Sequence, residues 1–241
     1  MIHSLGMDSV PVDELSNGRE EAADKCSVEC VPSPALAFAV RFSTRLFFLA
    51  LILASTSAIR RHMLAAAGVE FEAVPSNVDE AAIKATTTDP RDIASDLAAA
   101  KAQAVSERRA DDWIIGSDSV VAVDGRIFAK PRDRDEAAEH LRFFSGKRML
   151  LTSAVALARN GGVDWRHVGT ARLQVRPLSE AFISDYLDAE WPEVGYTVGV
   201  FRLEARGVQL FEEIDGDHFT ILGMPLIPLL GALRERGLLL T

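Results

Sequence analysis

Residues 51–61 read LILASTSAIRR, and this stretch decides how the fold begins. It continues an uncharged apolar run over residues 46–54, which has the length and composition of a buried strand. Three hydroxyl residues follow the run, and a helix is expected over residues 58–67, with Gly68 as its C-terminal stop. The stretch therefore predicts a strand, a small polar turn and a helix.

A polar turn between a strand and a helix is a natural place for an anion. The free N–H groups of the helix N-terminus and the helix macrodipole both favour negative charge. Ser55 adds a hydroxyl, and Arg60 and Arg61 are able to hold phosphate oxygens bidentately. The alternative is an ordinary solvated helix start with a serine cap. By itself, the turn leaves both interpretations open.

Composition and charge restrict the classes of partner. The 241 residues suit one large domain or two small lobes that share a cleft. The chain is 48% hydrophobic and 25% charged, as in ordinary globular proteins, and its net charge is −9. This charge gives no general attraction to nucleic acid or to an anionic membrane, so we expect neither as a partner. An anionic ligand must be held by a local cluster of Lys and Arg.

The N-terminal region differs from the remainder of the chain. Its first 34 residues carry seven acids against two bases, a composition typical of disorder. An acidic leader does not fit a secretory signal, and the uncharged segment after it is too short to span a bilayer. Cys26 and Cys30 lack the second ligand pair of a zinc site. We expect residues 1–45 to be a disordered or spurious extension and residues 46–241 to form the folded domain.

Residues 113–123 read WIIGSDSVVAV, a strongly β-prone stretch with a polar centre. An acid inside a central strand is unfavourable unless it is paired, hydrogen-bonded or bound to a metal. Asp118 is therefore a candidate catalytic or metal-binding carboxylate, with a structural hydrogen-bonding role as the alternative.

Two further side chains are candidates with an ordinary alternative beside them. Glu80 follows Asp79 after an expected strand, and this acidic pair either binds a divalent cation or belongs to a solvated turn. Lys101 lies beside the apolar stripe of an Ala-rich helix expected over residues 90–108. Its amine either points into a cleft or extends to solvent from the edge of the stripe.

The other segments mix strands and helices without strict alternation. A hairpin turn is expected at residues 124–125 and a loop near a ligand over residues 191–206. Strands are expected over 69–74, 150–159, 171–176 and 208–214, with an extension at 163–168, and helices over 135–144, 179–189 and 225–236. This pattern predicts an α/β fold with a mixed sheet and helices on its faces.

Several short motifs occur together in one order. They are LASTS at 53–57 with Arg60 and Arg61, VDE at 78–80, AKA at 100–102, GSDSV at 116–120, KP at 130–131, SG at 145–146 and LGMPL at 222–226. In this combination the chain resembles the Maf family of nucleoside triphosphate pyrophosphatases over about residues 51–233. The resemblance implies a mixed twisted sheet with flanking helices and two lobes around a central nucleotide cleft. It also implies a cytoplasmic protein that uses Mg²⁺ or Mn²⁺ and often forms a homodimer.

The resemblance implies roles for individual residues. Asp118 takes the position of the family's proton acceptor, and Glu80 that of its metal-supporting acid. Ser55 falls in the phosphate loop, and the phosphate-contacting basic residues match Arg60, Lys101 and Lys130.

The family's specificity positions fall on Ile59, Ser119 and Glu204. Glu204 resembles the 7-methyl-GTP-directed branch more than the dTTP/UTP-directed one. That branch usually has an aromatic residue at position 59 and Gln at position 119, and Ala58 replaces a proline common to both branches. Residues 198–201 also follow the usual glycine-containing segment only loosely.

The expected reaction is hydrolysis of a nucleoside triphosphate to a monophosphate and pyrophosphate, with modified nucleotides such as 7-methyl-GTP among the substrates. The alternative is a non-catalytic, nucleotide-binding regulator of septum formation, because the family has been linked to cell division. The presence of Asp118 beside the basic residues favours the enzyme, because binding alone does not need the acid.

Overall fold

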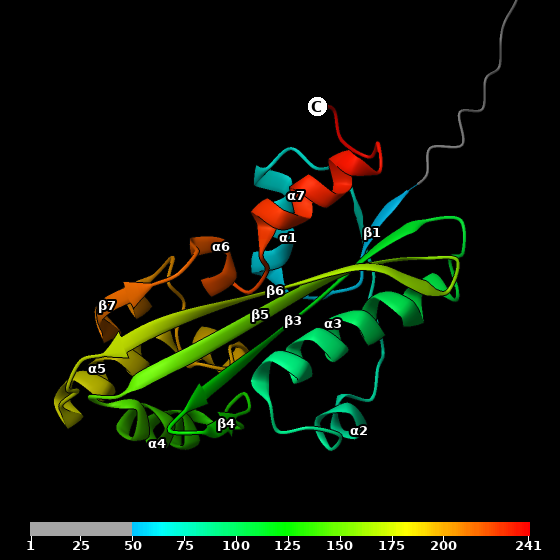
Figure 1. Ribbon diagram of the computed structural model, residues 1–241. Helices are drawn as coiled ribbons and strands as arrows, with labels where there is room; N and C mark the ends of the chain where they lie inside the picture. The colour runs from blue at the N-terminus through cyan, green and yellow to red at the C-terminus, as the bar shows by residue number, and fades with distance from the viewer. Residues whose placement is uncertain (1–49) are drawn as a thin grey trace, which may run out of the picture. The chain divides into compact units, whose positions relative to one another are not determined.

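A mixed β-sheet forms the centre of the fold (Figure 1). The computed structural model describes residues 50–241, within which the sheet has seven strands, and the expectations for residues 1–45 lie outside this part. The strands are β1 (Leu51–Leu53), β2 (Glu72–Ala73), β3 (Trp113–Val123), β4 (Arg126–Phe128), β5 (Arg148–Arg159), β6 (Gly162–Val175) and β7 (Phe211–Asp215). The order is β2-β1-β3-β5-β6-β7, with β4 beside β3. The first three strands of this order are parallel, and the other pairs are antiparallel.

Helices cover the sheet. They are α1 (Ala58–Ala66), α2 (Glu80–Lys84), α3 (Pro90–Ser106), α4 (Arg134–Phe144), α5 (Glu180–Glu190), α6 (His218–Ile221) and α7 (Leu226–Glu235), with 3-10 turns η1 (Glu193–Tyr196) and η2 (Arg206–Leu210). Five of the helices begin at a side chain that accepts a backbone N–H, namely Asp79, Asp89, Asp133, Ser179 and Asp217. The expected α/β fold with a mixed sheet and flanking helices is therefore confirmed. Within residues 50–241, no helix is both long and apolar enough to cross a membrane.

The alternation of β3 side chains divides the core. Ile114 and Val120 face α3, which lies along β3, β5 and β6 (Figure 1). Ile115 points the other way and packs with residues of α1 and α7, and Val121 packs with residues of α4 and α5. The single polar stretch in the middle of β3 is consequently shared between the two faces.

One edge of β3 is incompletely paired. β5 runs antiparallel to β3 along residues 114–123. On the opposite edge, β1 pairs only with residues 113–115 and β4 only with residues 121–123. Residues 116–120 therefore have no neighbouring strand on that edge, and this gap contains the GSDSV motif.

Some elements differ from the sequence expectations. The stretch expected as a strand over 69–74 pairs with β1 only at Glu72–Ala73. Helices α2 and α6 are not expected from the sequence, because five and four residues are too few for a periodic pattern. The strand expected over 171–176 and its extension over 163–168 form one continuous strand, β6, through Gly169. A Cβ on Gly169 would lie 2.5 Å from Thr220 Oγ1, so the glycine allows α6 to approach β6 and does not break it.

Gly116 determines how closely α3 lies on β3. A Cβ at this position would lie 2.1 Å from the carbonyl oxygen of Ala98 and 2.6 Å from the nitrogen of Ala102. Both atoms belong to the backbone of α3, so a side chain could be accepted only by moving the helix.

We predict that Gly116→Ala lowers the free energy of unfolding by about 1–3 kcal/mol or more, because overpacking displaces α3. Urea denaturation measures this change. Gly231→Ala in α7 is the matched control, because its Cβ meets no atom within 4 Å and should stabilise the helix by about 0.5–1 kcal/mol. Equal stability of the Gly116 variant and the wild type would contradict the close packing.

Candidate active site

A cleft of about 1010 Å³ opens at the unpaired edge of β3. Residues from the turn before α1, from α2, α3 and β3, and from the segments after β4 and η1 line it. All nine site residues expected from the sequence are among them: Ser55, Ile59, Arg60, Glu80, Lys101, Asp118, Ser119, Lys130 and Glu204. The structure thus brings together residues that lie up to 149 positions apart in the sequence (55 to 204).

An ion pair between Asp118 and Lys101 lies in this cleft. Lys101 Nζ is 2.6 Å from Asp118 Oδ1, and both side chains are 12% exposed. α3 brings the lysine to β3 because Gly116 permits the close contact described above. The lysine is therefore not a solvent-directed side chain at the edge of an apolar stripe. Among the described residues, Asp118 Oδ2 has no hydrogen-bond donor, so this oxygen is available to a ligand or a water.

Glu80 joins the same ammonium from α2. Its Oε1 lies 2.7 Å from Lys101 Nζ, and its Oε2 lies 2.9 Å from Lys84 Nζ. Partial burial would raise the pKa of Glu80, but hydrogen bonds from Lys101 and Lys84 outweigh burial and lower the pKa to about 2. The carboxylate is therefore ionised at neutral pH. The Asp79 side chain caps α2 and is not directed to the ammonium.

Arg60 is held rigidly on the other face of β3. Its Nε donates to Gly223 O at 2.9 Å, its Nη1 to Ser117 O at 3.0 Å and its Nη2 to Ser119 Oγ at 3.0 Å. Burial lowers the pKa of Arg60, while the charges of Asp118 and Glu80 oppose this shift. A guanidinium stays charged even so. Arg60 is consequently a fixed positive charge in the cleft wall.

Lys130 is the most accessible cation of the set. Among the described residues, it has no carboxylate within 4 Å. The residue as a whole is exposed, but partial desolvation of the ammonium, followed by the charge of Arg60, lowers the pKa of Lys130. A free ammonium beside a second cation is suited to binding an anion.

The turn before α1 adds backbone donors. Ser57 stands at the N-cap of α1 without a side-chain hydrogen bond to the helix, and no acid lies in the first turn. Ser55 Oγ accepts the N–H of Ser57 at 3.2 Å. The open helix start therefore lies in the cleft wall beside Ala58 and Ile59, as expected for an anion site.

The three expected specificity residues have different surroundings. Ile59 and Glu204 line the cleft, and within the described residues Glu204 has no ion-pair partner. Ser119 also lines the cleft, but its hydroxyl is hydrogen-bonded to Arg60, to Ser153 at 2.8 Å and to Gly223 O at 3.1 Å. The Ser119 hydroxyl therefore helps to hold the Arg60 guanidinium in place.

Sequence reasoning missed several cleft residues. Lys84 lies one helical turn after Glu80, and the i,i+4 spacing of an acid and a lysine was a usable signal. Tyr196 and Arg202 line the cleft from the loop that the sequence predicts near a ligand, but the sequence does not single out these two residues. Gly223 belongs to the quoted LGMPL motif, and its carbonyl oxygen accepts from Arg60, Ser117 and Ser119.

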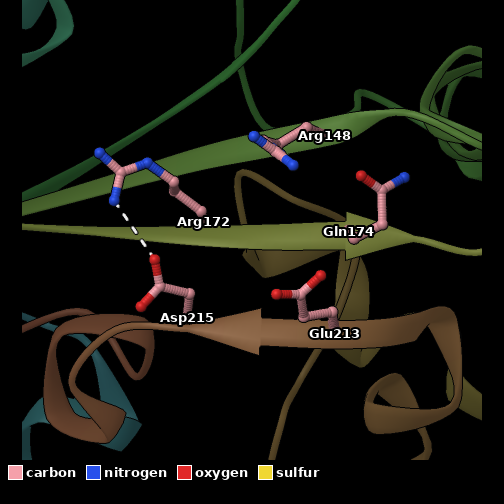
Figure 2. Close-up of a pocket in the computed structure, with 5 residues that line it drawn as sticks. All are labelled: Arg148, Arg172, Gln174, Glu213 and Asp215. Carbon is pink, nitrogen blue, oxygen red and sulfur yellow. Dashed lines mark hydrogen bonds and ion pairs between the residues drawn. The ribbon is translucent and has the colours of Figure 1, made fainter.

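A second, much smaller pocket lies on β5, β6 and β7 (Figure 2). Its volume is about 80 Å³, and its lining residues are Arg148, Arg172, Gln174, Glu213 and Asp215. Arg172 and Asp215 already form an ion pair at 3.3 Å (Figure 2). With two acids beside two arginines and little volume, this pocket does not compete with the cleft as a ligand site.

Comparison with known proteins agrees with the geometry. Residues 50–236 match the family described as Maf-like protein. The chain is 48% identical over 191 residues to the 7-methyl-GTP pyrophosphatase of Rhizobium meliloti (strain 1021), covering 78% of this chain and 96% of that relative. It is 47% identical over 193 residues to the nucleoside triphosphate pyrophosphatase of Sphingopyxis alaskensis, covering 78% and 98%. The chain therefore belongs to the Maf-like protein family.

Proposed function

We propose that this protein hydrolyses nucleoside triphosphates between the α and β phosphates, releasing a nucleoside monophosphate and pyrophosphate. The observation that carries this proposal is the Asp118–Lys101 pair inside a cleft that also holds Arg60 and Lys130. Relatives at 47–48% identity bear the names 7-methyl-GTP pyrophosphatase and nucleoside triphosphate pyrophosphatase, which supports the same reaction.

The cations bind and neutralise the triphosphate. A triphosphate brings several negative charges, and its transfer reactions depend on positioning and charge stabilisation. Arg60 is fixed by three hydrogen bonds, so it supplies charge without reorganising. Lys130 and the N–H groups at the start of α1 provide further donors from other sides of the cleft.

Asp118 acts as the proton acceptor. Lys101 holds Oδ1 and fixes the carboxylate, so Oδ2 is left to accept a proton from the attacking water. The water oxygen forms a bond to the α phosphorus as the bond to the bridging oxygen breaks, and pyrophosphate leaves with that oxygen. Arg60 and Lys130 stabilise the charge on the leaving group.

The acids of the cleft fit a divalent cation. Within residues 50–241, no group of three or more His, Cys, Asp or Glu side chains is arranged to hold a metal ion. Glu80 and Asp118 both contact the Lys101 ammonium, so a cation held by Glu80 would lie close to Asp118. Mg²⁺ is commonly held by one or two carboxylates together with substrate phosphates. Glu80 would hold Mg²⁺ or Mn²⁺ here together with substrate phosphates, and the ion would supply charge neutralisation on the phosphates.

The nucleobase occupies the part of the cleft near Ile59 and Glu204. A carboxylate without a cation partner is suited to accept base N–H groups or to face a positively charged base. 7-Methylguanine carries such a charge, and the 7-methyl-GTP pyrophosphatase from Rhizobium meliloti is among the similar relatives. We therefore propose 7-methyl-GTP as a preferred substrate.

We predict that Asp118→Asn lowers kcat for pyrophosphate release by about 10²–10⁴, because the amide cannot accept the proton. A coupled pyrophosphate assay measures kcat, and thermal unfolding checks the fold. Asp124→Asn, in the hairpin beside Lys147, is the matched control and should keep full activity. Turnover near the wild-type value in the Asp118 variant would remove this residue from the reaction.

The Lys130 ammonium predicts an alkaline limit to activity. Because its pKa is lowered, the charged form is present at lower pH and is lost as pH rises, earlier than for an ordinary lysine. The kcat/KM of the free enzyme should therefore fall on the alkaline side, and Lys130→Arg should move this fall to higher pH. Lys147→Arg, at a surface ion pair, should leave the profile unchanged. Identical profiles for wild type and Lys130→Arg would refute a phosphate contact by this lysine.

Glu80 gives a test of the metal. We predict that Glu80→Gln raises the Mg²⁺ concentration needed for half-maximal activity by about tenfold or more, since a carboxylate ligand is lost. The exposed Glu70→Gln is the control. Equal Mg²⁺ requirements in both variants would exclude Glu80 as a ligand.

A non-catalytic regulator is distinguished by the same assays. Such a protein binds nucleotide in equilibrium measurements but releases no pyrophosphate from any nucleotide tested with Mg²⁺ or Mn²⁺. This result for the wild type would overturn the proposed hydrolysis.

A further inference from the structure

One wall of the cleft has no regular secondary structure to hold it. Residues 197–204 make up all but the last residue of the connection from η1 to η2, and seven of these eight line the cleft, all except Val200. No strand or helix ladder fixes this backbone. The segment includes Glu204, so its conformation decides where that carboxylate lies.

Val200 has an unfavourable backbone conformation. Its φ is +55°, in the left-handed region that a β-branched residue rarely adopts, and its side chain is 0% exposed. A residue persists in such a conformation only where its surroundings hold it. Within the segment, Thr197 Oγ1 accepts the N–H of Phe201 at 3.1 Å, and further contacts come from α5.

Tyr186 of α5 supplies the first contact. Its hydroxyl donates to Val200 O at 3.0 Å, and the tyrosine is buried. Burial, and then the charge of Glu190, raise the pKa of Tyr186, so the hydroxyl stays protonated and remains a donor. Tyr186 itself does not line the cleft.

Glu190 supplies the second contact from the next turn of α5. It is 6% exposed, and its Oε2 accepts from Arg202 Nη2 at 3.1 Å and from Arg202 Nε at 3.3 Å. Arg202 is two residues before Glu204. Positions 186 and 190 share one face of α5, so this face contacts the segment at both Val200 and Arg202.

We infer that Tyr186 and Glu190 are positioning residues that set the nucleobase selectivity of the cleft by fixing the wall of residues 197–204. This inference rests on the proposed function. The phosphate-facing residues come from α1, α3, β3 and the segment after β4, and none belongs to this wall. Substitutions that move this wall should therefore change selectivity for the base without changing binding of the triphosphate.

The test compares Tyr186→Phe and Glu190→Gln with the wild type. The kcat/KM for pyrophosphate release is measured with 7-methyl-GTP, GTP and UTP at one Mg²⁺ concentration. The ratio between the best and the poorest nucleotide should fall about tenfold, mainly through KM of the best nucleotide, with kcat nearly unchanged. Glu180→Gln is the matched control on the same helix, because its partner Arg142 lies at the surface, and it should keep the wild-type ratio.

A double substitution tests the route of the effect. If Tyr186 acts through Glu204, Tyr186→Phe should change the ratio little further in a Glu204→Gln background. Independent, multiplying effects would overturn the inference. So would folded single variants with the wild-type ratio, or an equal loss of kcat for every nucleotide. Those results leave the proposed hydrolysis standing, whereas a wild type that releases no pyrophosphate refutes the hydrolysis itself.

Discussion

The close contact between α3 and β3 is the constraint on which the site depends. A lysine side chain reaches a carboxylate inside a strand only if its helix lies directly on that strand. Gly116 makes this possible, because its missing side chain lets the backbone of α3 come within contact distance two residues before Asp118. The unpaired edge of β3 then opens the same residues to solvent and ligand. Residues 116–120 thus provide both the close contact with α3 and the opening to solvent.

The charge of the cleft differs in sign from the net charge of the protein. The chain carries a net charge of −9, yet the cleft is lined by more cationic than acidic side chains. The cations are Arg60, Lys84, Lys101, Lys130 and Arg202, and the acids are Glu80, Asp118, Glu193 and Glu204. Lys101 lies between Asp118 and Glu80, and Glu80 is also bound to Lys84, so these acids are already compensated. Arg60 and Lys130 are therefore left to meet an anion. Such focusing allows an acidic protein to bind a polyphosphate.

The sequence predicts those features in which a residue is unusual for its local surroundings. An acid within the β-prone run of β3 requires an explanation, and the strand is found at the predicted residues with Asp118 in the cleft. The position of Lys101 stays ambiguous from the sequence, because only the tertiary contact at Gly116 decides where its amine points. The hydrogen bonds of the Ser119 hydroxyl and the left-handed conformation of Val200 involve partners far away in the sequence. The five-residue helix α2 is capped locally by Asp79 but is too short to show a periodic pattern. No local periodicity encodes them.

The support of Arg60 has a consequence for biosynthesis. Arg60 belongs to the first helix of the described fold, and its Nε donates to Gly223 O, 163 residues later in the chain. A domain generally folds as a unit once its chain has been synthesised. At a synthesis rate of about 5–20 residues per second, this carbonyl is added about 8–33 s after Arg60. The nascent chain therefore gains its complete anion-binding wall only when nearly the whole protein has been made.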